Sequence, residues 1–336
     1  MVTHAVALTQ ALLGAESGSD WVLFSSRERV PGLTRRSEAV LSPHRHELAN
    51  KLLWFPAVEG SSGLDAILYP YWPPPPRRRR EAPPAAFFVH DLAFRLRPDD
   101  VPWQQRAYLG TVLPPALRNA AAVFVPSRST EADLLGCYPF PGLASRVHMV
   151  PEGPTPLPPA GPLPTGLEPG FVLAVGTLEA RKNYRRLVAA HAAIAGAPPL
   201  VFAGRPGWNG DWVPSGPAVR VLGHVDDATL ASLYRHASIL AFPSLYEGFG
   251  IPLLDAMASG VPALVGDRGA LPELAGEAAL AVEAESTEAI AAGLRRLLSE
   301  AALRKRLSIA GRRRAKSFSW PAAADLVLRY LAGIVE

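Results

Sequence analysis

Short apolar runs alternate with helical segments along most of this chain, and that alternation limits the folds open to it. In the second half, apolar runs at Phe171–Gly176 and Ile239–Phe242 are each followed by a segment with helical spacing, and a further run lies at Leu200–Gly204. The first half shows the same alternation, for example at Ala86–Val89 and Ala122–Val125. Strands that alternate with helices form mostly parallel sheets covered by helices. The sequence therefore predicts an α/β protein with two doubly wound, Rossmann-like domains, whose ligand lies in the cleft between them.

A segment rich in proline and glycine, residues 151–170, separates the two halves. It has almost no apolar periodicity, which is typical of a linker. We expect an N-terminal domain over residues 1–155, the linker over 151–170, a C-terminal domain over 171–318 and a last helix over 319–336. The 336 residues suffice for two domains of ordinary size.

Composition restricts the kind of protein and its partners. The net charge of +4, from 34 basic and 30 acidic residues, favours anionic ligands such as nucleotides without indicating a nucleic-acid partner. The single cysteine, Cys137, excludes an intrachain disulfide and indicates a reducing compartment. No signal peptide is visible before Leu13, and the longest uncharged stretch, Leu187–Gly204, is broken by glycine and proline. We expect a cytoplasmic protein, with peripheral membrane contact as the alternative.

The richest motif is residues 242–260, a strand, a glycine-bearing turn and a helix. Glu247 and Asp255 bracket the turn at a separation of eight positions. Glycines where a strand turns into a helix let a ligand approach the main chain, and the helix start favours a phosphate or a sugar oxygen. Taken singly, each acid is a surface residue. Together they predict a ligand site whose turn residues are Gly248, Phe249, Gly250 and Ile251.

Basic residues follow two other strands of the second half. Arg181 and Lys182 come after Phe171–Gly176, beside a helix start, where a guanidinium and an ammonium can bind phosphate together. Arg205 follows Leu200–Gly204, where we expect it to approach a phosphate of the ligand, although the glycines around it lack the spacing of a dinucleotide-binding fingerprint.

Polar residues also follow two strands of the first half. His90 and Asp91 come after Ala86–Val89, while Ser127, a good helix N-cap, and Arg128 come after Ala122–Val125. These are the ends of strands where open α/β sheets bind ligands. Residues 71–80, which read YWPPPPRRRR, predict an extended polyproline segment with a solvated basic loop, or else a contact with an anionic lipid or acceptor.

Glu-Gly-Phe-Gly-Ile-Pro at 247–252, then Ala-Met-Ala-x-Gly-x-Pro at 256–262, resembles the donor-site signature of the retaining group 1 glycosyltransferases (family GT4, GT-B fold). Arg181-Lys182 is similar to that family's diphosphate-binding pair, and the likeness points to a mannosyltransferase-like bacterial branch. The family pattern is Glu-x7-Glu, whereas the second acid here is Asp255. The family also opens with a strand and a glycine-rich loop, while this chain opens with helical spacing from Val2 to Leu13. Either the true start lies upstream, or the protein works without that loop.

The resemblance implies transfer of a hexose from a GDP- or UDP-sugar to a hydroxyl of a saccharide or glycolipid, with retention at the anomeric carbon. It implies that Arg181 and Lys182 stabilise the leaving diphosphate, that Glu247 holds the sugar, and that Asp255 holds the ribose. Val225, in Gly223-His224-Val225-Asp226-Asp227, would line the nucleobase pocket. His90 would meet the sugar or the acceptor with Asp91 orienting it, and Ser127 and Arg128 would border the acceptor. The last helix would cross back to the first domain.

Two other functions stay open: a nucleotide-sugar epimerase or hydrolase on the same scaffold, and a non-catalytic sugar-nucleotide binder. The chain has no Asp-x-Asp motif, which carries the metal in GT-A transferases. We therefore expect no metal and no other cofactor in the transfer.

Overall fold

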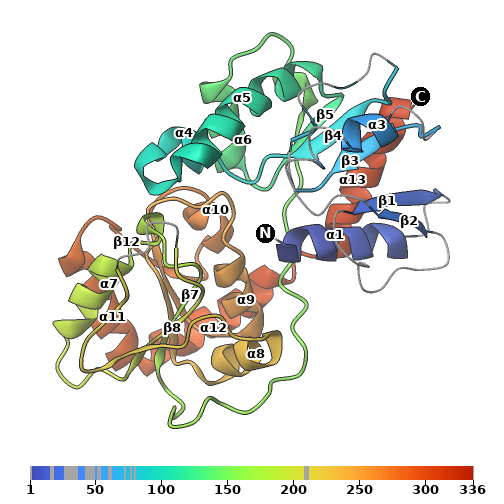
Figure 1. Ribbon diagram of the computed structural model, residues 1–336. Coiled ribbons are helices and arrows are strands. Elements are labelled where there is room, and N and C mark those ends of the chain that lie inside the picture. Colours follow the sequence, from blue (N-terminus) through green and yellow to red (C-terminus); the bar gives the residue numbers. More distant parts are fainter. Residues whose placement is uncertain are drawn as a thin grey trace. The chain divides into compact units, whose positions relative to one another are not determined.

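The structure is a computed structural model that describes residues 2–15, 19–25, 37–41, 50, 54–59, 63–71, 73–75, 78, 81–207 and 212–335. The chain divides into two compact units (Figure 1). Unit 1 comprises Met1–Leu92, Gln104–Glu152 and Ser319–Glu336, and unit 2 comprises Ala93–Trp103 and Gly153–Phe318. Residues 93–103, which the sequence had placed in the N-terminal domain, are thus grouped with unit 2.

Unit 1 contains a four-stranded parallel sheet in the order β3-β4-β5-β6 and a separate parallel pair, β1-β2. Its helices and strands are α1 (Val2–Gly14), β1 (Trp21–Ser25), β2 (Ser37–Leu41), α3 (Phe55–Glu59), β3 (Ile67–Tyr69), β4 (Ala85–Phe88), α5 (Trp103–Asn119, whose first residue belongs to unit 2), β5 (Ala122–Val125), α6 (Arg128–Cys137), the 3-10 helix η3 (Ala144–Arg146), β6 (Val147–Met149) and α13 (Trp320–Val335). The predicted helix over Glu47–Phe55 lies largely outside the described residues.

The core of unit 1 forms where α1 and α13 pack beside each other (Figure 1). Leu8 and Leu12 of α1 and Ala324 and Val327 of α13 are buried together with residues of β4 and β5. The last helix therefore contributes to the same hydrophobic core as the first. In the predicted segment Tyr71–Arg80, the described Arg78 is not a free cation, because its Nε lies 2.8 Å from Oε2 of the buried Glu59.

Unit 2 contains a six-stranded parallel sheet in the order β12-β11-β10-β7-β8-β9. Its elements are α4 (Ala93–Leu96), the 3-10 helix η2 (Pro98–Asp100), β7 (Val172–Val175), the 3-10 helix η4 (Ala180–Lys182), α7 (Tyr184–Ala192), β8 (Leu200–Ala203), β9 (Val219–Val221), α8 (Asp227–His236), β10 (Ile239–Phe242), α9 (Ile251–Ser259), β11 (Ala263–Gly266), α10 (Leu271–Ala275), β12 (Leu280–Val282), α11 (Thr287–Ser299) and α12 (Ala301–Ala315). The chain runs outward from β7 to β9, then returns to place β10 on the other side of β7. The sheet therefore has a topological switch point between β7 and β10, where open α/β sheets bind ligands.

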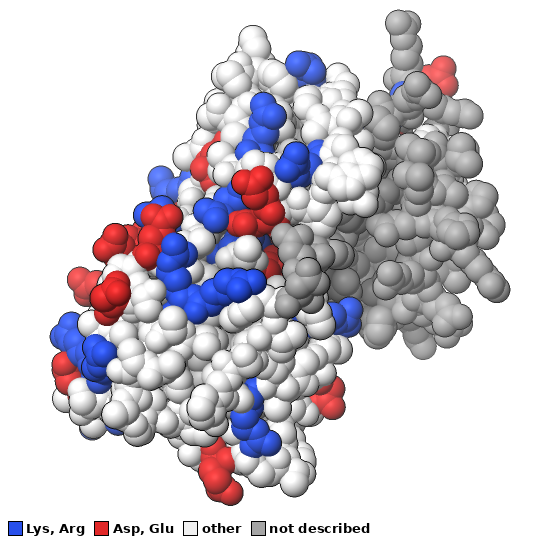
Figure 2. Space-filling view, turned by 60° about the vertical axis from the view of Figure 1, so that its left-hand side comes forward, with Lys and Arg blue, Asp and Glu red and all other residues white. Residues whose placement is uncertain are grey.

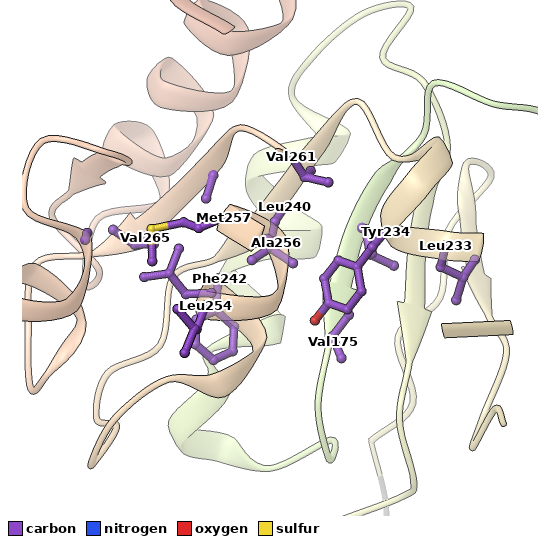
Figure 3. Close-up of a cluster of buried hydrophobic side chains, with 14 of the residues drawn as sticks. Val175, Leu233, Tyr234, Leu240, Phe242, Leu254, Ala256, Met257, Val261 and Val265 are labelled. Atoms are coloured by element: carbon purple, nitrogen blue, oxygen red, sulfur yellow. The ribbon is translucent and has the colours of Figure 1, made fainter. Parts of the chain in front are cut away.

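Alternate residues of these strands enter two separate cores. Leu173, Val175 and Phe242 pack on one face with residues of α8 and α9, and this core is drawn in Figure 3. Val172 and Ala174 pack on the other face with residues of α7 and α11. This explains why the strands read as unbroken apolar runs, since both faces of the sheet are covered. Among the described residues, no helix is both long and apolar enough to cross a bilayer.

Gly204, just after β8, permits a close approach that fixes the loop after β7. A Cβ atom at this position would lie 2.0 Å from the carbonyl oxygen of Gly176. We expect Gly204→Ala to lower the free energy of unfolding by about 1–3 kcal/mol, because the two backbones must separate. Chemical denaturation measures this loss. The control is Gly110→Ala on the exposed side of α5, where a Cβ meets nothing within 4 Å; it should add about 0.5–1 kcal/mol. Equal effects of the two substitutions would contradict the prediction.

Candidate functional site

Three charged side chains meet at the switch point of unit 2. Arg181 and Lys182 lie in η4, which follows β7, and Glu247 lies between β10 and α9. One oxygen of Glu247 accepts a hydrogen bond from Arg181 Nη1 at 2.9 Å, and the other accepts one from Lys182 Nζ at 2.7 Å. The sequence had predicted that these residues act together, and the structure brings them into direct contact.

Two members of this trio are shielded from water, and Arg181 is partly exposed. Lys182 and Glu247 are each 6% exposed, and Lys182 Nζ also lies 4.7 Å from the centre of the Phe242 ring. Burial alone would raise the pKa of Glu247, but the charges of Lys182 and Arg181 outweigh burial and hold that pKa below its usual value. Burial lowers the pKa of Lys182, while Glu247 opposes that shift. In this protein the carboxylate is thus the counterion of two cations that are costly to bury alone.

Two residues that the sequence analysis did not assign to the site hold Arg181 and its loop in place. Glu179 Oε2 accepts a hydrogen bond from Arg181 Nε at 2.8 Å. Asn183 adopts a left-handed conformation with φ 62°, and its side-chain amide donates to the carbonyl oxygens of Pro243 at 3.0 Å and Ala284 at 2.5 Å. Asn tolerates this conformation better than most residues. Its amide therefore ties the loop after β7 to the loop after β10.

Asp255 lies apart from the trio in its contacts. It is 4% exposed on α9, and its two oxygens accept hydrogen bonds from the backbone N–H and the hydroxyl of Thr155, both at 2.7 Å. Thr155 belongs to the predicted linker, within unit 2. The carboxylate predicted for the ribose is therefore bound by the protein's own threonine in this structure.

Burial raises the pKa of Asp255 to about 6 from a reference value of 3.8, while the Thr155 hydrogen bonds act in the opposite direction. Between these pH values the folded protein keeps a proton that the unfolded chain releases, so stability falls as pH rises through this window. The loss reaches roughly 3 kcal/mol above the folded-state pKa. We expect Asp255→Asn, which retains shape and hydrogen bonding, to gain stability relative to the parent as pH rises from about 4 to 7. Thermal unfolding at several pH values measures the gain, and a difference that does not change with pH would contradict it.

The other residues predicted to bind the donor lie before and at the start of α9, in the core of unit 2, and after β8 and β9. Gly250, with φ 113°, precedes α9, whose first residue is Ile251, and Gly248 lies next to Glu247 in the same loop. Phe249 is buried in the core, where its ring meets that of Phe318, so its observed contacts are those of a packing residue. After β8 and β9, the exposed Arg205 lies 3.3 Å from His224, next to Val225.

In unit 1, His90 is engaged through both ring nitrogens. Nδ1 lies 3.2 Å from Glu152 Oε1, and Nε2 lies 2.9 Å from the carbonyl oxygen of Pro70. Glu152 thus lies against the ring, and an orienting contact from Asp91 stays a prediction. Burial alone would raise the pKa of Glu152, but His4 and His90 outweigh it and hold the pKa well below its usual range.

Ser127 caps α6, because its hydroxyl accepts a hydrogen bond from the Thr130 N–H at 3.0 Å. Arg128 is exposed at the first position of that helix. The predicted N-cap is confirmed. A place for these two residues beside an acceptor stays a prediction.

Charges of both signs lie next to one another on the face shown in Figure 2. Interspersed charges of this kind produce little net field at a distance. An anionic ligand that binds on this face must then be attracted by the basic side chains close to its site.

The comparisons with known proteins concern the family and the fold. Residues 162–314 match the family model described as glycosyl transferases group 1. The O-antigen chain mannosyltransferase B of Escherichia coli is 30% identical over 249 residues, which cover 69% of this chain and 65% of that protein. The MMP α-(1→4)-mannosyltransferase of Mycolicibacterium hassiacum is 42% identical over 104 residues, 30% of this chain and 25% of that one. The chain thus spans less than two thirds of each of these relatives.

Solved structures resemble almost the whole chain. A sucrose-phosphate synthase from Thermosynechococcus elongatus has a TM-score of 0.72 at 23% identity, covering 95% of this chain and 90% of that one. HepE from Anabaena, in complex with UDP and glucose, has a TM-score of 0.72 at 16% identity, covering 98% of this chain and 95% of that one. The predicted GT-B fold is confirmed. Over residues 162–314, the chain thus resembles the group 1 glycosyltransferases.

Proposed function

We propose that this protein transfers a hexosyl group from a nucleoside diphosphate sugar to a hydroxyl of a saccharide or lipid-linked saccharide, with retention of the anomeric configuration. The observation that carries the proposal is the contact of Arg181 and Lys182 with Glu247 at the switch point of unit 2. The match to the family model over residues 162–314 supports the reaction class.

The roles proposed for these residues follow from the charges that develop during transfer. When the bond between the sugar and the diphosphate breaks, negative charge grows on the leaving group and positive charge grows near the anomeric carbon. Cations that are already in place stabilise that leaving group without reorganisation. The guanidinium of Arg181 can bind phosphate oxygens in a bidentate manner, and Lys182 adds a point charge. Once a diphosphate takes over as their counterion, Glu247 is released to accept hydrogen bonds from sugar hydroxyls and to face the developing positive charge.

The proposed transfer needs no metal. Arg181 and Lys182 supply the positive charge that a divalent ion supplies in other transferases. We expect a chelator to leave the transfer rate unchanged.

The donor is proposed to be a GDP- or UDP-sugar. One relative is named a mannosyltransferase, and a structural neighbour contains UDP and glucose. Gly248, Gly250, Ile251, Val225 and Arg205 would surround this donor, and Asp255 would reach the ribose once Thr155 releases it. Asp91, Ser127 and Arg128 would lie on the acceptor side. His90 would reach the sugar only after giving up a contact with Pro70 or Glu152.

A thermal-shift screen of UDP-, GDP- and ADP-sugars tests the proposal. One donor class should raise the unfolding temperature, and transfer assays with the same donor should give a product only when an acceptor is present. Product without acceptor would instead indicate an epimerase or hydrolase.

A non-catalytic sugar-nucleotide binder is the second candidate, because both oxygens of Asp255 are taken by Thr155. In that case the donor would bind, and no acceptor would yield product.

A further inference from the structure

A cluster of three side chains in unit 1 contains two residues, His4 and Glu152, that play no part in the reaction proposed above. His4 lies on α1, His90 follows β4, and Glu152 follows β6. One ligand atom from each lies within 4.8 Å of the others. His4 is 2% exposed and Glu152 is 4% exposed. The cluster thus joins three segments that are far apart in the sequence.

The separations within the cluster point to a shared centre. Oε1 of Glu152 lies 2.8 Å from Nδ1 of His4 and 3.2 Å from Nδ1 of His90. Both separations place a ring nitrogen of each histidine against the same carboxylate oxygen.

The contact of His90 with Pro70 determines which of its two ring nitrogens can bind a cation. Nε2 lies 2.9 Å from the carbonyl oxygen of Pro70, which can only accept a hydrogen bond, so Nε2 carries the hydrogen. In the neutral ring, Nδ1 then presents its lone pair toward Glu152. Histidines that bind metals usually donate their other ring N–H to a carbonyl or carboxylate in this way.

The negative charge of the buried Glu152 carboxylate also needs a positive partner. A buried carboxylate is stable only with a positive partner. Within the part of the chain that the structure describes, the ion pairs of Glu152 are those with His4 and His90, and neither Lys nor Arg contacts it. The Nε2 atom of His4 is buried without any partner, so the environment of this ring is incomplete.

We propose that His4, His90 and Glu152 bind one Zn²⁺ ion. Two histidines and one glutamate are a known ligand set for Zn²⁺, with metal–ligand distances of roughly 2.0–2.2 Å. In a tetrahedral site such ligand atoms lie roughly 3.4 Å apart. The separations of 2.8 and 3.2 Å lie below that value, and the three ligand atoms all lie within 4.8 Å of one another. The ion joins α1 to the carboxyl ends of β4 and β6. While the ion is bound, His90 does not reach the sugar, and the transfer chemistry of unit 2 gains no step from the metal.

The test is a metal titration of the full chain after treatment with chelator. We expect one Zn²⁺ per chain, a higher unfolding temperature with Zn²⁺, and visible absorption bands of tetrahedral coordination with Co²⁺. Glu152→Gln and His4→Gln should each weaken Zn²⁺ binding by about 100-fold or more, since even outer contacts of a metal site are worth about 10–100-fold. The control is His148→Gln, because His148 stacks on Tyr330 in the same unit and is not part of the cluster.

Metal binding by the parent protein tests the proposal even if a variant fails to fold. Absence of Zn²⁺ binding by the parent, or Co²⁺ spectra without histidine ligation, would overturn the proposal. Equal affinity of the parent and a folded Glu152→Gln variant would do the same. Because the readouts are binding, spectra and stability, they are independent of glycosyl transfer, and the two proposals can fail separately.

Discussion

Replacement of Arg181 by alanine should weaken the binding of the nucleoside diphosphate sugar by about 10–100-fold and slow transfer by about 10²–10³-fold. The first figure follows from the value of a hydrogen bond to a charged group, about 1.5–3 kcal/mol. The second follows from the loss of one fixed donor that stabilises charge in the transition state. Fold stability should change less, because Glu247 keeps its hydrogen bond from Lys182.

Two variants make the Arg181 experiment specific. Arg181→Lys keeps the charge but loses the fork geometry, so its affinity should fall between those of the parent and Arg181→Ala. The control is Arg235→Ala, because Arg235 is an exposed arginine in the last turn of α8. Calorimetry measures donor binding, and an acceptor-dependent assay measures transfer. Should Arg181→Ala bind the donor as tightly as Arg235→Ala, the assignment of Arg181 to the diphosphate is wrong.

The contact between the loops after β7 and β10 could be predicted from sequence because it depends on local signals. Each loop follows an unbroken apolar run, and carboxyl ends of neighbouring parallel strands meet at one edge of a sheet. Arg181, Lys182 and Glu247 were assigned from their positions after these runs, and they contact one another. The N-cap Ser127 was also visible, since its side chain binds the backbone N–H of Thr130, three residues away.

Partners far apart in sequence could not be predicted in this way. Thr155 binds Asp255 across 100 positions, and no motif marks either residue as the other's partner. The contacts of Glu152 with His4 and His90 likewise appear only once α1, β4 and β6 are assembled. A single sequence gives the types of residue at strand ends, but it does not give the pairing of loops with linkers or with the first helix.

Burial can outweigh a local signal, as in α5. Proline normally interrupts a helix, yet α5 is continuous from Trp103 to Asn119 with Pro114 and Pro115 inside it. A proline inside a helix costs about 3 kcal/mol. The neighbouring Val112, Leu113, Ala116 and Leu117 are all buried, and each large apolar side chain gains about 1.5–3 kcal/mol on burial. Tertiary packing therefore offsets the cost of the prolines.

Glu247→Gln should lower the free energy of unfolding by about 3–5 kcal/mol in the ligand-free protein. The substitution removes the negative charge between two cations. It leaves the buried Lys182 uncompensated, which is the costly way to break a buried ion pair, while Arg181 keeps its pair with Glu179. The control is Glu300→Gln, which removes an exposed pair with Arg296 at 3.0 Å and should change stability by less than about 1 kcal/mol. Chemical denaturation of the parent and both variants measures these differences.

Addition of UDP or GDP separates a structural role of Glu247 from its proposed place in the donor site. If the diphosphate replaces Glu247 as counterion of Arg181 and Lys182, the nucleotide should stabilise Glu247→Gln more than it stabilises the parent, because binding restores the missing negative charge. Transfer should still be lost, since a neutral amide cannot balance positive charge near the anomeric carbon. Equal stabilisation of parent and variant would mean that the diphosphate does not compete with Glu247 for the two cations, and the proposed donor site would have to lie elsewhere.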